Sequence, residues 1–210
     1  MRRSLRALIT GAVACVMLSG VAEARTVNQC VIKSRTSCAG KDLSGQNLRG
    51  VNLRKANLRG ADLSNADLSG ADLTSANLYG AKLFYTKLDK ANLTNANIYG
   101  AKLFYSKLDN ANLTSANLYA AKLFYTKLSS ANLTNANLTA AKLFYSKVTG
   151  ADLSYANLSY ADLKGSDLTG AILKSTNFSH ANLLGATLTL SSLDQGLLGG
   201  ATMPDGTIHN

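Results

Sequence analysis

The residues best suited to chemistry in this chain are lysines and aromatic residues that recur every 20 positions. The segment K-L-F-Y-T/S-K occurs four times, at residues 82–87, 102–107, 122–127 and 142–147. A lysine ammonium group binds carboxylate or phosphate, and an aromatic ring stacks on the flat face of a sugar. The pattern therefore favours a surface that contacts an anionic polymer or glycan, or an anionic lipid surface.

Residues that could carry out catalysis are few and do not cluster. The histidines are His180 and His209, both in the C-terminal third of the chain. No Cys–His, Ser–His–Asp or clustered-carboxylate arrangement stands out, and the sequence has no glycine-rich phosphate loop. We therefore expect no enzymatic activity and no cofactor.

A second regularity, with a period of five, decides the architecture. A large aliphatic residue or Phe occupies every fifth position from Leu43 to Ile208, 34 positions in all. Five fits neither the 3.6-residue turn of a helix nor the two-residue alternation of a strand. It fits a chain that bends sharply every five residues and points one large and one small residue inward on each side.

The period of 20 indicates how many sides form one coil. Residues 81–100, 101–120 and 121–140 nearly repeat one another, so four pentapeptides make one coil of a square, all-β solenoid. At a strand spacing of about 4.8 Å, we expect about eight coils and a rod roughly 40 Å long.

In such a coil, the side chains of Asp62, Asp67 and Asp72 point from three different sides. This arrangement argues against a metal ion shared by the three carboxylates.

The repeated unit resembles the A-D/N-L-x-x pattern of the pentapeptide-repeat family. Examples are ADLSN (61–65), ANLTN (91–95), ADLSY (151–155) and ANLSY (156–160). The resemblance implies a right-handed quadrilateral β-helix over residues 41–210. From 81 to 148 the position before Leu is often Lys, where the family prefers Asp or Asn.

Stacked coils should place the four copies of K-L-F-Y-T/S-K on one side of the rod, which we call the Lys–aromatic face. The coils before and after it carry Asp at the equivalent lysine positions, as at Asp62 and Asp162. The candidate binding face comprises Lys82, Phe84, Tyr85, Lys87, Lys102, Phe104, Tyr105, Lys107, Lys122, Phe124, Tyr125, Lys127, Lys142, Phe144, Tyr145 and Lys147.

Two other interpretations of these columns stay open. Aromatic residues favour strands and their stacking stabilises a ladder, so the face could be scaffold, and duplication of one coil would also produce identical columns. Alternatively, two rods could pair side by side across the Phe column and form a homodimer.

The N-terminal residues predict export. Residues 1–24 have a basic start, an apolar stretch and an A-x-A site, which is typical of a signal peptide cleaved after Ala24, although an uncleaved anchor is the alternative. Removing three Arg and one Glu lowers the net charge from +10 to +8. We expect a periplasmic or secreted protein in which residues 25–40 form an N-terminal cap. Cys30 and Cys38 could form a disulfide there, or remain two separate thiols.

These features favour a non-enzymatic, exported rod that binds or supports other molecules. The sequence does not identify the partner, for which an anionic glycan, a lipid surface or an envelope protein are the candidates. The family resemblance also implies a topoisomerase-binding mimic of DNA as an alternative function. Mimicry requires an acidic surface and a cytoplasmic location, whereas this chain is basic and carries an export signal. Direct binding of nucleic acid would suit the basic charge, but an exported protein does not meet this partner.

Overall fold

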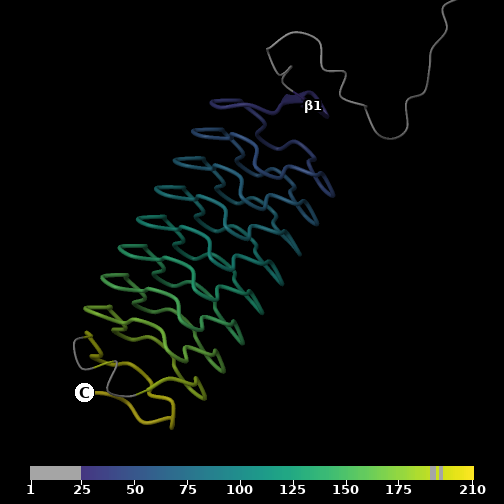
Figure 1. The fold of residues 1–210 in the computed structure, drawn as a ribbon. Helices are drawn as coiled ribbons and strands as arrows, with labels where there is room; N and C mark the ends of the chain where they lie inside the picture. The colour runs from purple at the N-terminus through teal and green to yellow at the C-terminus, as the bar shows by residue number, and fades with distance from the viewer. Residues whose placement is uncertain (1–24, 190–192, 194–195) are drawn as a thin grey trace, which may run out of the picture.

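The computed structural model describes residues 25–189, 193 and 196–210, and its backbone winds as stacked rungs from one end of a rod to the other (Figure 1). The predicted signal peptide, residues 1–24, lies outside the described residues. The named strands are β1 (Thr26–Val27) and β2 (Cys30–Val31), which pair antiparallel. The rest of the sheet structure consists of single-residue bridges, because the chain bends before a longer strand can form.

The bridges define the coil. From Ser37↔Asn57 to Asn182↔Thr202 they are parallel and join each residue to the one 20 positions later. Within one turn there are four bridge columns, as at Lys82, Lys87, Asn92 and Asn97. One coil is therefore 20 residues and has four sides. The ladder begins at Ser37, four residues before the repeat boundary that the sequence suggested.

Each corner of the coil is a tight turn held by two kinds of hydrogen bond. In residues 62–66, the amide of Ala66 donates to the Leu63 carbonyl (3.0 Å), and Asn65 has a left-handed φ of 59°. A positive φ at this third position is what a type II turn requires. In addition, the Ser64 amide donates to the carboxylate of Asp62 (3.0 Å). Asp and Asn thus suit the position before Leu because their side chains fix the following corner.

The inward positions form one continuous apolar core. Every fifth residue from Leu43 to Phe178 is at most 2% exposed, and most of the small residues two positions earlier are buried with them. The prediction fails at the last position. Ile208 is 56% exposed, because the chain reverses after Met203 and Ile208 pairs antiparallel with Thr202 instead of continuing the coil.

The β1–β2 hairpin lies against the first coil. The Asn28 side chain donates to the Asp42 carbonyl and Arg25 donates to the Asn47 carbonyl, both at 2.7 Å. These carbonyls belong to the open edge of the ladder, which no earlier coil covers. Cys30 and Cys38 are buried and joined by a disulfide with their Cα atoms 5.2 Å apart, which holds this segment to the start of the ladder.

We expect acid to destabilise the rod. Partial burial opposes ionisation of Asp72, but hydrogen bonds from Thr74 and Arg54 outweigh it and lower the pKa of this carboxyl. Hydrogen bonds from the Thr207 amide and hydroxyl lower the pKa of Asp205. Such carboxyls stabilise the fold above their unfolded pKa of about 3.9, and this stabilisation is lost as the pH falls through the lower folded value. The midpoint temperature of thermal unfolding should therefore decrease when the pH is lowered below about 4. Equal midpoint temperatures at pH 2 and pH 6 would contradict this.

Candidate binding face

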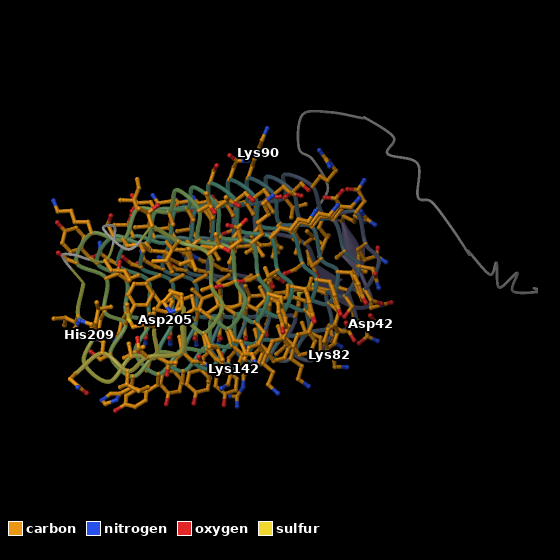
Figure 2. All side chains as sticks on the ribbon, turned by 90° about the horizontal axis from the view of Figure 1, so that it is seen from below. Asp42, Lys82, Lys90, Lys142, Asp205 and His209 are labelled. Carbon is orange, nitrogen blue, oxygen red and sulfur yellow. A yellow bond between two sulfur atoms is a disulfide. The ribbon has the colours of Figure 1, made fainter. Side chains whose placement is uncertain are left out.

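The structure brings the sixteen residues of the Lys–aromatic face together on one side of the rod. Bridges link Lys82, Lys102, Lys122 and Lys142 in one column, and Lys87, Lys107, Lys127 and Lys147 form a parallel column. Lys82 and Lys142, at the two ends of the first column, project from the same side (Figure 2). Four successive coils therefore present the same set of side chains in register.

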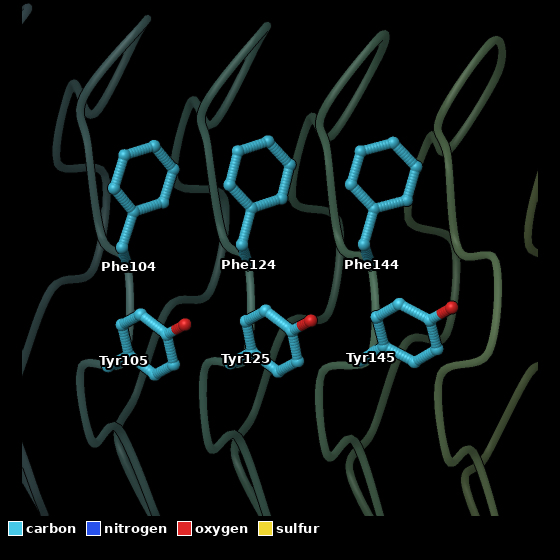
Figure 3. A pocket seen from close by; sticks show the side chains of 6 residues that line it. All are labelled: Phe104, Tyr105, Phe124, Tyr125, Phe144 and Tyr145. Atoms are coloured by element: carbon cyan, nitrogen blue, oxygen red, sulfur yellow. The ribbon is translucent and has the colours of Figure 1, made fainter.

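The aromatic rings between the lysines form two stacked rows (Figure 3). Ring centroids in the Phe row are 4.7–5.2 Å apart, and those in the Tyr row are 5.0–5.5 Å apart. The tyrosines are exposed, whereas the phenylalanines are half-buried. The phenylalanines also point outward, but each ring is partly covered by its neighbours in the row. Together the rows line an open groove of about 520 Å³, formed by Phe104, Tyr105, Phe124, Tyr125, Phe144 and Tyr145.

The Tyr row occupies an unfavourable backbone conformation. Its members have left-handed φ values between 51° and 58°, at the corner position that suits Gly or Asn. A bulky side chain in this region is disfavoured by about 1–2 kcal/mol. The row ends at Gly165, where a Cβ atom would overlap the Tyr145 ring, so this position provides space for the last ring of the row.

The lysines replace residues that elsewhere fix the corners. At every bridge position from Asp42 to Asn182 that is occupied by Asp or Asn, the side chain accepts a hydrogen bond from the amide two residues later. Lysine cannot accept such a bond. At seven of the eight lysine corners the corresponding amide forms no hydrogen bond within the described residues; the exception is Ser129, which donates to Asp109.

The charges of the face are balanced only at its ends. Lys82 lies 3.2 Å from Asp62, Lys87 lies 3.9 Å from Asp67, and Lys142 lies 3.8 Å from Asp162. In the described part of the chain, the remaining lysines of the face form no ion pair. These are Lys102, Lys107, Lys122, Lys127 and Lys147. The middle coils therefore carry uncompensated positive charge beside exposed rings.

Asparagine fills two columns of the rod, and one of them forms a ladder of side-chain amides. Asn97, Asn117 and Asn137 each donate to the asparagine of the preceding coil at 3.3–3.4 Å. The column of Asn92, Asn112 and Asn132 forms no such ladder. The Asn92 and Asn112 oxygens accept from the hydroxyl of the Thr two residues later, and the Asn132 oxygen accepts from the amide of Thr134.

The inward-facing Ser and Thr hydroxyls that follow the Tyr row in the sequence are also part of the scaffold. Thr86 donates to the Leu63 carbonyl, and both Ser106 and Thr126 donate to the Leu103 carbonyl. These side chains are at most 1% exposed, so a substrate cannot reach them. His180 stacks on Tyr160 with ring centroids 4.9 Å apart, a pairing that reading the sequence in columns of 20 could have found.

Other kinds of site find no support in the described residues. Over residues 25–189, 193 and 196–210, no three His, Cys, Asp or Glu side chains converge as metal ligands. The same residues contain no helix with the length and hydrophobicity needed to cross a membrane. The Lys–aromatic face is thus the main candidate for a functional surface.

The family model for pentapeptide repeats matches residues 36–74, 76–114, 116–154 and 156–195. The chain belongs to the pentapeptide-repeat family. This family forms right-handed quadrilateral β-helices, in agreement with the four bridge columns per coil. The Asp and Asn corners are the family's usual ones, and the lysine corners depart from them.

Among solved structures, this pentapeptide-repeat protein is similar to HetL of the cyanobacterium Nostoc sp. strain PCC 7120, which is involved in regulating heterocyst differentiation. The two are 39% identical over 84% of this chain and 82% of HetL, with a TM-score of 0.61. A trypsin-treated form of QnrB1, a plasmid-mediated fluoroquinolone resistance protein, is 21% identical over 80% of this chain and 90% of QnrB1, with a TM-score of 0.58. The second likeness shows the fold alone. A comparison with curated proteins found no match.

Proposed function

We propose that this pentapeptide-repeat protein is an exported, non-enzymatic rod that binds anionic envelope material through the Lys–aromatic face. The rod has about eight coils, its first coil is capped by residues 25–40, and the signal peptide directs it to the periplasm or outside the cell. Pentapeptide-repeat proteins are generally structural or binding proteins. The net charge of +8 that remains after removal of residues 1–24 favours an anionic partner and disfavours mimicry of DNA.

The observation that carries the proposal is that two unfavourable local features coincide on the same four coils. Like charges stack at the coil spacing, and the corners lack their side-chain hydrogen bonds. Ring stacking returns only about 0.5–1.5 kcal/mol per pair. Departures from local preference that cluster in this way are typical of functional surfaces.

A capture experiment with matched variants tests the proposal. Residues 25–210 are incubated with isolated envelope fractions at low and high salt. One variant carries Gln at Lys102, Lys107, Lys122 and Lys127, and the control carries Gln at Lys33, Lys55, Lys90 and Lys174, outside the face. Both lose four charges, so a non-specific effect of charge would affect them equally.

We expect capture of the native protein to decrease as salt rises, since exposed charges are screened within about 10 Å at 0.1 M ionic strength. Capture should be lost in the face variant and kept in the control. Equal capture of the two variants would contradict the proposal.

A second candidate function is side-by-side self-association, which the apolar groove favours because its three tyrosine rings are exposed and its three phenylalanine rings are partly exposed. Association that increases with protein concentration and disappears with Phe104→Ser and Phe124→Ser would support it. Ligand binding by a monomer that stays monomeric at high concentration supports the first candidate instead.

A further inference from the structure

The groove between the two ring rows has a direction. Its walls are Phe104, Phe124 and Phe144 on one side and the corresponding tyrosines on the other, contributed by three successive coils (Figure 3). Successive coils follow one another along the rod, so the groove runs parallel to the rod axis. A ligand that fills it must be extended in the same direction.

The lysines that form no ion pair belong to the same coils as these rings. Lys102 and Lys107 come from the coil of Phe104, and Lys122 and Lys127 come from the coil of Phe124. The aspartates that neutralise Lys82 and Lys87 lie at the edge of the face, beyond the groove. Each middle coil thus offers a ligand one Phe ring, one Tyr ring and two ammonium groups that form no ion pair.

The spacing of the rings indicates the kind of polymer. The repeat along the groove is 4.7–5.5 Å, whereas stacked nucleotides in a strand advance by about 3.4 Å and would lose register within a few coils. A bilayer surface is broad and does not need a narrow groove. A chain of sugar rings, each with a carboxylate, repeats an apolar ring surface and a negative charge in every unit, so successive units can meet the rings and lysines of successive coils.

We propose that the groove binds a linear acidic polysaccharide of the uronic acid type, extended along the rod axis, with successive sugar units on successive coils. The Tyr105, Tyr125 and Tyr145 hydroxyls all point toward the C-terminal end of the rod, where they can bond sugar hydroxyls (Figure 3). This inference rests on the proposed function and specifies its ligand.

The experiment tests whether affinity for an oligosaccharide depends on the number of coils that form the groove. Deleting residues 101–120 removes one coil of the groove in register, and deleting residues 41–60 removes one coil outside the Lys–aromatic face and keeps the aspartates paired with Lys82 and Lys87. Binding of both variants and of the native protein to galacturonate oligomers of increasing length is measured by calorimetry, and circular dichroism verifies that each variant folds. Fully methyl-esterified oligomers, which keep the rings but lose the charges, are the ligand control.

For the native protein, we expect affinity to rise with oligomer length until the chain spans the groove, and then to level off. Deletion of 101–120 should weaken binding of the long oligomers about ten-fold or more, by analogy with ring stacking on single strands, and reach the plateau at a shorter length. Deletion of 41–60 should leave both unchanged. If the first deletion does not fold, Tyr105→Asn with Tyr125→Asn should give the same loss of affinity, because Asn suits these corners.

The outcomes separate this inference from the proposed function. Equal effects of the two deletions, or affinity that does not depend on oligomer length, would overturn the axial arrangement. Binding to single-stranded nucleic acid or to anionic vesicles but not to galacturonate would overturn the ligand class, while salt-sensitive envelope capture through the face would still support the proposed function.

Discussion

Leu103→Ala is expected to lower the free energy of unfolding by about 2–5 kcal/mol. Leu103 is 1% exposed in the middle of the rod, and the register of 20 places Leu83 and Leu123 in the adjacent coils. Removing its side chain leaves a cavity that the surrounding coils cannot close, because their backbones are fixed to one another by the ladder. Urea unfolding followed by circular dichroism measures the loss.

Leu197→Ala is the matched control. Leu197 stands at a bridge position of the last coils and is 64% exposed. Its truncation should change the free energy of unfolding by no more than about 0.5 kcal/mol. If Leu103→Ala has an equally small effect, the inward leucines do not form the core that supports the face.

Replacing lysines of the face with asparagine is expected to stabilise the rod. The amides of Phe104, Asp109 and Phe124 form no hydrogen bond in the described structure, since Lys102, Lys107 and Lys122 stand at the preceding bridge positions. In the neighbouring column, the Asn97 side chain accepts from the Tyr99 amide and donates to Asn77. Asparagine at each of the three lysine positions should accept from the amide two residues later, and the asparagine at position 122 can also donate to the one at position 102.

The expected gain is modest for each residue and adds up over the three. A hydrogen bond contributes about 0.5–1.5 kcal/mol, and these corners are exposed, so we take the lower end, about 1.5 kcal/mol in total. Removing the repulsion between stacked lysines should increase the free energy of unfolding further, by at most about 1 kcal/mol per pair at low salt. Lysines that belonged to the scaffold would give the opposite sign, because losing their stems would uncover the rings.

Much of the fold could be predicted because the sequence repeats it. The identity of the inward residues follows from a period of five, and the contents of each column follow from a period of 20, so Lys82 and Lys102 could be placed side by side without a structure. Periodicity cannot show where the repeat stops. Ile208 keeps the sequence register, yet the turn closed by the Met203 amide and the Thr207 carbonyl directs the chain backward.

The composition of the candidate site could be predicted, but not its physical state. The sixteen residues follow from the columns, whereas the left-handed backbone of Tyr105 and the free amide of Phe104 depend on how a corner closes. The partial burial of the phenylalanines depends on ring orientation, which no residue pattern specifies. Of these features, the free amides beside the lysines distinguish the face from the other corners of the rod.

The most direct test of the account measures stability and binding on one protein, the triple variant Lys102→Asn, Lys107→Asn and Lys122→Asn. We predict a higher free energy of unfolding than that of the native chain, together with loss of salt-sensitive capture by envelope fractions. This combination would show that the lysines are kept for binding at the expense of stability. A variant that unfolds more easily and is still captured would contradict the account and identify the Lys–aromatic face as scaffold.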